Sequence, residues 1–215
     1  MAAICIDTAT ENGLIAVAPE AGPIASVSWR SARRHGENQF GYIDMALSEG
    51  KVAREALSLV GVDIGPGRFT SLRVGLATAK GLSLGLGLPI VGVSSLRVLA
   101  RSMPADRDAV RVPTIDAYRG DVFAAAYVLE GGSLRELCAP WFGRPDEALE
   151  RIRAAVPERP ICTDVVAATP EAIVAETRHV MRADGPADLA LLEPQYLRPS
   201  DAKLPDRPLR TEHSR

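Results

Sequence analysis

The chain has 215 residues, of which 47% are hydrophobic and 24% charged, and its formal net charge is −2. This length allows one large domain or two small ones with a substantial core. The near-neutral charge argues against a surface that binds nucleic acid over its whole extent. The three cysteines, Cys5, Cys138 and Cys162, lack the spacing of a zinc site or of a disulfide framework.

The sequence shows no segment typical of export or of membrane insertion. Asp7 interrupts the first apolar run and no basic residue precedes it, so we expect no signal peptide. The longest uncharged run, residues 81–96, is shorter than the ~20 residues of a membrane helix and contains Pro89. We therefore expect a cytoplasmic protein without a membrane partner.

The first hundred residues alternate strand and helix patterns. Strands are predicted over residues 3–7, 14–18 and 24–29, with Asn12-Gly13 in the first turn. A helix is predicted from Gln39 to Ser48 and a strand from Ala56 to Asp63. The turn Gly65-Pro66-Gly67 then leads through Arg68, Phe69 and Thr70 into a long helix that ends near Leu86. A short strand over 89–95 and a helix to Arg101, capped by Ser94 or Ser95, complete this part.

The pattern then begins again. Residues 110–132 contain an apolar strand, the pair Ile115-Asp116, a polar turn and a second strand, as residues 3–22 do around Ile6-Asp7. This repetition suggests an internal duplication. A strand near 134–140, a helix over 145–155, a strand over 160–163 and a helix over 170–181 follow. We predict an N-terminal domain of residues 1–104, a degenerate second domain of residues 105–200 and a flexible tail of residues 201–215.

The glycine turn invites comparison with known phosphate sites. No Gly-Lys pair has the spacing of a P-loop, and Thr70 replaces the third glycine of the dinucleotide fingerprint. An actin-like fold, with an aspartate and a hairpin facing phosphates in each half, fits Asp7 and Asp116 better. However, Thr8-Ala9 and Ala117-Tyr118 stand where such hairpins need glycine for backbone approach. The pattern therefore supports an actin-like fold more strongly than it supports a phosphate-binding active site. We interpret the two hairpins as vestigial phosphate-binding hairpins.

The long helix is apolar on both sides. One side carries Leu72, Leu76, Ala79, Ser83 and Leu86, and the opposite side carries Val74, Ala77, Gly81 and Gly85. Only Arg73 and Lys80 are charged. A helix of this kind is buried on both sides, either within its own chain or against a partner. We predict a partner interface over two helices, formed by Phe40, Ile43, Leu47, Arg73, Ala77, Lys80, Gly81, Leu84 and Gly85.

Other chemistry is sparse. His35, His179 and His213 are isolated, and no pair has a metal-binding spacing. The loop that contains Arg33, Arg34 and His35 is either solvated surface or a contact for RNA phosphates. We predict no catalytic residue, no metal ion and no cofactor of the chain's own.

Four segments resemble the TsaB (YeaZ) family. "DIGPGRFTSLRVGLATAKGL" resembles the glycine-turn signature of that family, and "IDTATENG", "IDAYRGDVF" and "EPQYLR" match it in the same order. Arg68 stands where the family usually has serine, and Ser71 where it usually has glycine. The resemblance covers about residues 3–205.

The resemblance implies a duplicated actin-like, ribonuclease H-like α/β fold and a non-catalytic role. A TsaB-like subunit would pair with the catalytic paralogue TsaD, aided by the ATPase TsaE. The complex transfers a threonylcarbamoyl group to N6 of the adenosine beside the anticodon in tRNAs that read ANN codons. The resemblance further implies tRNA contact only through the complex, possible ATP or ADP at the complex interface, and self-association without the partner. A stand-alone hydrolase such as a peptidase, a small-molecule kinase, and a homodimeric binding module are the alternatives.

Overall fold

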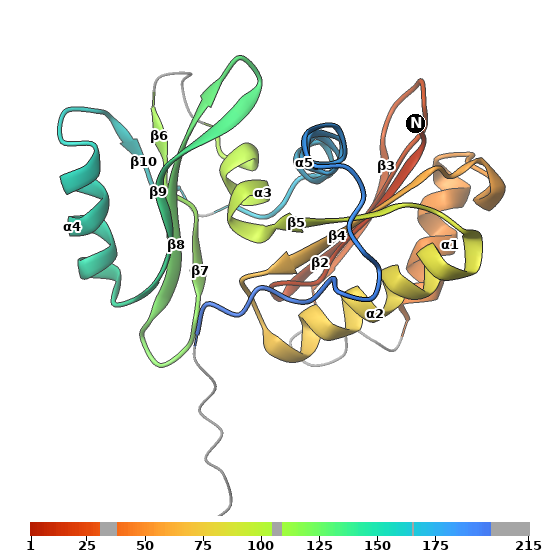
Figure 1. Ribbon diagram of the computed structural model, residues 1–215, viewed down its shortest axis with the longest axis horizontal. Coiled ribbons are helices and arrows are strands. Elements are labelled where there is room, and N and C mark those ends of the chain that lie inside the picture. The colour runs from red at the N-terminus through yellow and green to blue at the C-terminus, as the bar shows by residue number, and fades with distance from the viewer. Residues whose placement is uncertain (31–37, 105–108, 165, 199–215) are drawn as a thin grey trace, which may run out of the picture.

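A computed structural model describes residues 1–30, 38–104, 109–164 and 166–198, and contains two β-sheets with helices packed on them. Figure 1 shows the two sheets at opposite ends of the molecule, with helix α3 between them. The first half contains β1 (Ala3–Asp7), β2 (Asn12–Ala18), β3 (Ala25–Arg30), α1 (Gln39–Glu49), a short 3₁₀ turn (Arg54–Ala56), β4 (Leu59–Gly65), α2 (Phe69–Leu86), β5 (Ile90–Ser94) and α3 (Ser95–Ser102). The second half contains β6 (Val110–Arg111), β7 (Thr114–Asp116), β8 (Val122–Glu130), β9 (Ser133–Gly143), α4 (Pro145–Ala155), β10 (Ile161–Cys162) and α5 (Pro170–Ala183).

The first sheet has the order β3-β2-β1-β4-β5. β2 pairs antiparallel with both β1 and β3, whereas β4 pairs parallel with β1 and β5. Helices α1 and α2 cover one face, where Ile43 and Leu76 pack with β-strand residues such as Ile4 and Val60. Helix α5 covers the other face through Ile173 and Val174. The sheet is therefore buried on both faces, which explains its nearly continuous apolar strands.

The second sheet repeats the first in a smaller form. β8 pairs antiparallel with β9 on one side and with β6 and β7 on the other, and β10 pairs parallel with β6. The order β9-β8-β6/β7-β10 thus matches β3-β2-β1-β4, with β6 and β7 together taking the place of β1. Helix α4 covers one face and α3 the other. The internal duplication is confirmed. Among the described residues, the helix that follows β10 packs on the first sheet, and no strand of the second sheet corresponds to β5.

Helix α5 lies in the range predicted for the second domain but packs on the first sheet, against β5, β1 and β2. The following segment, residues 186–198, is called the C-terminal strap here. Its Ala187 N–H donates to Ile90 O at 2.8 Å, and its Gln195 N–H donates to Ile64 O at 2.6 Å. Packing therefore assigns α5 and most of the strap to the first sheet, in correction of the 105–200 boundary.

No helix in the described ranges combines the length and the apolar character needed to cross a membrane. The predicted tail, residues 201–215, and the loop with Arg33, Arg34 and His35 lie outside the described residues, as does His213.

Candidate functional site

A cleft of about 280 Å³ lies between the two halves of the molecule. The end of β1 and the hairpin after it form one wall, and β7 with its turn forms the opposite wall. The polar residues that line the cleft are Asp7, Thr10, Glu11, Asn12, Asp63, Arg68, Ser95, Thr114, Asp116 and Tyr118. The two predicted hairpin aspartates, Asp7 and Asp116, therefore face the same cavity, as the duplicated pattern requires.

The floor of the cleft is an acidic pair. Asp7 and Asp63 follow the paired residues Ile6 and Val62 at the carboxyl ends of neighbouring parallel strands. Both side chains are buried, and their carboxyl groups contact each other. Burial is the main cause that raises the pKa of Asp7 to about 6. Burial first, and then the charge of Asp7, raise the pKa of Asp63 well above its usual range.

One oxygen of the acidic pair has no N–H or hydroxyl donor among the described residues. Asp63 Oδ1 accepts from Gly65 N–H at 2.7 Å and from the Ser95 hydroxyl at 2.5 Å, whereas Oδ2 receives no such bond. A proton on either carboxyl group would supply the donor that Oδ2 lacks, in agreement with the raised pKa values of the pair. Ser95 was predicted as a helix cap, but its hydroxyl is directed to Asp63, and Ser94 makes no side-chain cap.

Four backbone amides around the cleft donate to acceptors within the chain. Ala9 N–H donates to Asp7 at 2.9 Å and Tyr118 N–H to Asp116 at 2.8 Å. At the glycine turn, Gly65 N–H donates to Asp63, and Arg68 N–H donates to Ala9 O at 2.8 Å. A Cβ atom on Gly67 would overlap Ala9 O, so glycine is needed here for packing between two loops. The Gly65 and Arg68 amides of the turn therefore bond to the chain itself. In a phosphate-binding turn, such amides would be free to donate to the ligand.

The hairpin of the second half carries side chains where glycine is favoured. Tyr118 and Arg119 have φ angles of 63° and 59°, in the left-handed region, and Gly120 follows at 84°. Such angles cost a non-glycine residue about 1–3 kcal/mol. The conformation places the Tyr118 ring 5.8 Å from the Arg68 guanidinium, across the cleft. The side chains of Tyr118 and Arg68 therefore face each other from opposite sides of the cleft.

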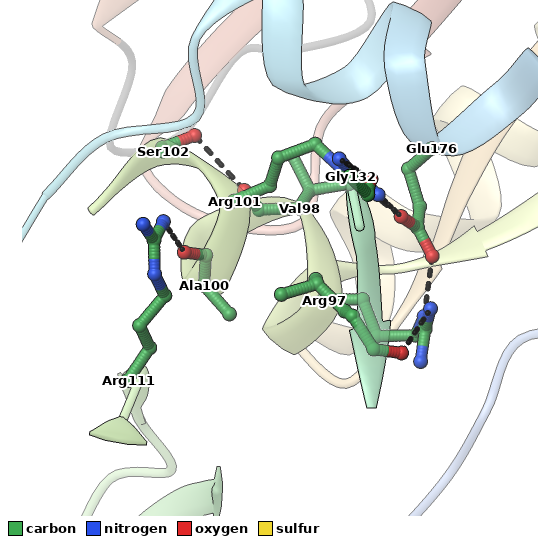
Figure 2. A network of polar contacts seen from close by, with 9 residues as sticks. Arg97, Val98, Ala100, Arg101, Ser102, Arg111, Gly132 and Glu176 are labelled. Atoms are coloured by element: carbon green, nitrogen blue, oxygen red, sulfur yellow. Dashed lines mark hydrogen bonds and ion pairs between the residues drawn. The ribbon is translucent and has the colours of Figure 1, made fainter. Parts of the chain in front are cut away.

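A buried ionic network fixes α3 between the two sheets (Figure 2). Glu176 of α5 is fully buried and forms ion pairs with Arg97 and Arg101 of α3. The two arginines also donate to the β8–β9 hairpin, Arg101 to Gly132 O at 2.9 Å and Arg97 to Leu134 O at 3.3 Å. Arg111 donates to two carbonyl groups at the end of α3. The network thus joins helix α5 on the first sheet, helix α3 and the second sheet.

Helix α2 leaves one side uncovered. Leu72, Leu76, Ala79 and Ser83 are buried against the sheet. The opposite side, called the open face here, consists of Phe69, Arg73, Ala77, Gly81, Leu84 and Gly85, with Lys80 half-buried beside it. Leu84 is 75% exposed and Phe69 53% exposed. A Cβ atom added to Gly81 or Gly85 would meet nothing within 4 Å. In the described residues, then, the chain contacts the second apolar side of its long helix at Phe69 and Arg73, through Tyr196, and leaves Ala77, Gly81, Leu84 and Gly85 exposed.

The structure corrects part of the predicted partner interface. Ile43 and Leu47 are buried in the core beneath the first sheet, because the inner side of α1 rests on the strands. Phe40, predicted on the same side, is exposed at the first turn of α1. Pro66 is buried in the glycine turn and Thr70 is exposed at the start of α2. The predicted interface residues that remain accessible are thus Phe40 and those of α2.

Two residues of the site were not predicted from the sequence. Asp63 is the single charged residue near the end of an otherwise apolar strand, as Asp7 is at the end of β1, and this similar position was the available signal. Tyr196 lies in the C-terminal strap and reaches α2, where its hydroxyl accepts a hydrogen bond from Arg73 Nε at 2.9 Å. No local pattern indicates this long-range contact. Among the described residues, no three histidine, cysteine, aspartate or glutamate side chains converge on a common point suitable for a metal ion.

Comparisons with known proteins agree with this architecture. The family model for TsaD, described as tRNA N6-adenosine threonylcarbamoyltransferase, matches residues 28–165. The tRNA threonylcarbamoyladenosine biosynthesis protein TsaB of Escherichia coli is 30% identical over 150 residues, which are 69% of this chain and 62% of that protein. TsaB of Bacillus subtilis is 31% identical over 64% of this chain and 59% of that protein. The matched regions span less than two thirds of the length of these relatives.

Solved structures show the same fold. YeaZ from Pseudomonas aeruginosa superimposes with a TM-score of 0.77 at 21% identity, over 91% of this chain and 99% of that one. A P. aeruginosa protein described as similar to the peptidase YeaZ gives 0.79 at 23% identity, over 92% and 99%. The duplicated actin-like, ribonuclease H-like fold predicted from the sequence is confirmed. With its family-model match and its TsaB relatives, the chain belongs to the TsaB (YeaZ) family of TsaD-related proteins.

Proposed function

We propose that the chain is a non-catalytic subunit that supports a TsaD-like transferase. The reaction is the transfer of a threonylcarbamoyl group to N6 of the adenosine beside the anticodon in tRNAs that read ANN codons. The names of the TsaB relatives and the description of the matching family support this reaction. The accessory role rests on the chain's own geometry.

The observation that best supports the accessory role is the hydrogen bonding and the charge of the residues that line the cleft. Four amides around it, those of Ala9, Gly65, Arg68 and Tyr118, donate to acceptors within the chain. Four carboxylates line the same cavity, together with one arginine, Arg68. A polyphosphate would find these four amides already bonded and would lie against an acidic floor. The arrangement supports a chain that keeps the actin-like fold but does not use its own cleft for ATP hydrolysis.

The open face of α2 supports a partner. Solvent-exposed apolar side chains over a long helix are typical of an interaction surface. Phe69, Leu84 and Phe40 are all more than half exposed, at 53%, 75% and 64%. We propose that the TsaD-like paralogue covers this face and that a second copy of the chain covers it when the partner is absent. A TsaE-like ATPase and a nucleotide shared at the complex interface complete the proposal, and tRNA is contacted through the complex.

A peptidase is the second candidate, because one structural neighbour is described as similar to a peptidase. A peptidase needs an activated nucleophile or a metal ion near its substrate. His179 is the single histidine in the described part of the chain, and it lies on α5, away from the residues that line the cleft. The geometry therefore favours the accessory role.

The proposed function is tested by affinity purification of the tagged chain from its own cells, with bound proteins identified by mass spectrometry. The TsaD-like paralogue should be enriched by the natural chain and lost with Gly81→Arg. Sedimentation at micromolar concentration should show self-association of the isolated chain above its monomer mass of 22.9 kDa. Absence of a TsaD-like protein from the natural chain's eluate would contradict the proposal.

A further inference from the structure

Arg73 is held on the open face of α2 by two aromatic rings. Its guanidinium carbon lies 3.8 Å from the centre of the Phe69 ring and 5.9 Å from the centre of the Tyr196 ring. The two ring centres are 5.3 Å apart. Phe69 precedes Arg73 by one helical turn, whereas Tyr196 comes from the C-terminal strap. The side chain is thus oriented by its own helix and by a distant segment.

The hydrogen bonds of Arg73 leave the end of the guanidinium available. Nε donates to the Tyr196 hydroxyl at 2.9 Å, and the terminal nitrogens have no acceptor among the described residues. Those nitrogens carry four N–H donors in a planar fork that matches a carboxylate. A fork that is already oriented loses less conformational entropy when it binds than a freely rotating side chain does.

The charged residues of helix α2 itself are all positive. Helix α2 contains Arg73 and Lys80 and no aspartate or glutamate. The two cations are seven residues apart, which places them about 10 Å apart along the helix axis. Ala77, Gly81 and the exposed Leu84 lie between and beyond them. The open face of α2 and the neighbouring Lys80 therefore combine positive charge with exposed apolar area.

Resting on the proposed function, we infer that Arg73 anchors a carboxylate of the TsaD-like partner, an aspartate or glutamate side chain set beside an apolar patch. Tyr196 is a positioning residue that orients the fork. A protein carboxylate fits better than an RNA phosphate, because Leu84 and the small residues next to the cations need an apolar counterpart. A ribose-phosphate backbone does not provide one.

Isothermal titration of the full-length chain with the TsaD-like protein, at low and high salt, tests this inference. The variants are Arg73→Gln, Arg73→Lys and Tyr196→Phe, and Arg153→Gln on the exposed side of α4 is the control. We expect Arg73→Gln to weaken binding about tenfold or more and to reduce its salt dependence. Arg73→Lys should recover only part of the loss, because lysine keeps the charge without the fork. Arg153→Gln should bind as the natural chain does.

The role of Tyr196 is tested by a double-mutant cycle. Tyr196→Phe should weaken binding several-fold with an unchanged melting temperature, and should have no further effect when Arg73 is already glutamine. Normal binding by Arg73→Gln, or additive effects of the two changes, would overturn the inference while leaving the proposed function intact. A variant that keeps the TsaD-like protein but loses tRNA in a filter assay would also overturn it, in favour of a phosphate. If the natural chain itself does not bind the TsaD-like protein, both the proposed function and this inference are wrong.

Discussion

Asp7 at the end of β1 and Asp63 near the end of the parallel strand β4 hold their carboxyl groups in contact at the floor of the cleft. Two buried carboxyl groups in contact do not both ionise readily, and one proton between them removes the repulsion. The same pair fixes the glycine turn and the start of α3, because Asp63 accepts from Gly65 and Ser95. The acidic pair at the floor of the cleft therefore connects β1, the glycine turn and the start of α3.

The acidic pair predicts that stability decreases as the pH rises. Both pKa values are raised in the folded chain, Asp7 to about 6 and Asp63 further above its usual range. The folded state then binds more protons than the unfolded chain. The pair's contribution to the free energy of unfolding is present below about pH 4. The part that comes from Asp7 is lost as the pH rises through about 6, and the part that comes from Asp63 is also lost as the pH rises.

Asp63→Asn should remove much of this dependence. The asparagine amide donates to Asp7, and its oxygen still accepts from Gly65 and Ser95. Urea unfolding should show a variant about 1–3 kcal/mol more stable than the natural chain at pH 8, and of similar stability at pH 4.5. Asp116→Asn, at an exposed carboxylate, is the control. Equal slopes of stability against pH for Asp63→Asn and the natural chain would contradict the shared proton.

Two glycines of α2 should respond in opposite ways to alanine. At Gly81 the added methyl group enters open space, and helix propensity should stabilise the chain by up to about 1 kcal/mol. At Gly75 it overlaps the Thr8 hydroxyl, which donates to Ser71 O at 2.7 Å, and the chain should lose about 1–3 kcal/mol. Chemical denaturation measures both changes. A loss of stability at both positions would mean that the chain itself covers the open face.

Gly81→Arg separates folding from association. The monomer should remain folded by circular dichroism, because nothing lies within 4 Å of the new Cβ atom. Binding to the TsaD-like protein should be lost, since a charge without a counterion in a desolvated contact costs several kcal/mol. A folded variant with normal binding would show that the partner does not approach the middle of α2.

The isolated chain should not bind ATP tightly. The amides of Ala9, Gly65 and Tyr118 donate within the chain, and acidic side chains line the floor of the cleft. Calorimetry with Mg-ATP should detect no binding in the micromolar range, and an actin-like ATPase serves as the positive control. A micromolar dissociation constant, which corresponds to about −8 kcal/mol, would contradict the accessory reading of the cleft.

The network between the sheets should be a main determinant of stability. Glu176→Ala leaves Arg97 and Arg101 without their buried carboxylate, and we expect a loss of about 3 kcal/mol in unfolding experiments. Glu130→Ala, which removes the exposed ion pair with Arg135, is the matched control and should change stability little. Similar losses of stability for the two variants would mean that the buried ion pairs of Glu176 stabilise the chain no more than the exposed ion pair of Glu130 does.

Local patterns predicted most elements. Helix α4 has the predicted bounds, because Pro145 begins it and acidic residues occupy its first turn. The glycine turn and the repeated Ile-Asp pairs predicted the fold and the shared cleft. Asn12-Gly13, however, lies within β2 and not in the turn, because Gly13 pairs with Trp29 and a Cβ atom there would overlap the indole ring.

Long-range packing explains what the sequence could not predict. Periodicity gives the apolar side of a helix but not the element that covers it, so Ile43 and Leu47 were assigned to a partner although the first sheet buries them. The sequence left both sides of α2 open to either interpretation, and tertiary structure shows which side faces outward. Asp63 lies beside Asp7 because of the register between β1 and β4. Tyr196 reaches Arg73 because the C-terminal strap passes α2. Neither contact follows from a fixed spacing in the sequence.

The most direct test of the proposed role is reconstitution of the modification from purified components. The TsaD-like and TsaE-like proteins and an ANN-decoding tRNA are combined with a threonylcarbamoyl donor, with or without this chain. Threonylcarbamoyladenosine in the tRNA is then measured by mass spectrometry. We predict modification only when the natural chain is present, no modification with Gly81→Arg, and normal modification with Arg153→Gln. Equal modification with and without the chain would contradict its role as a required subunit.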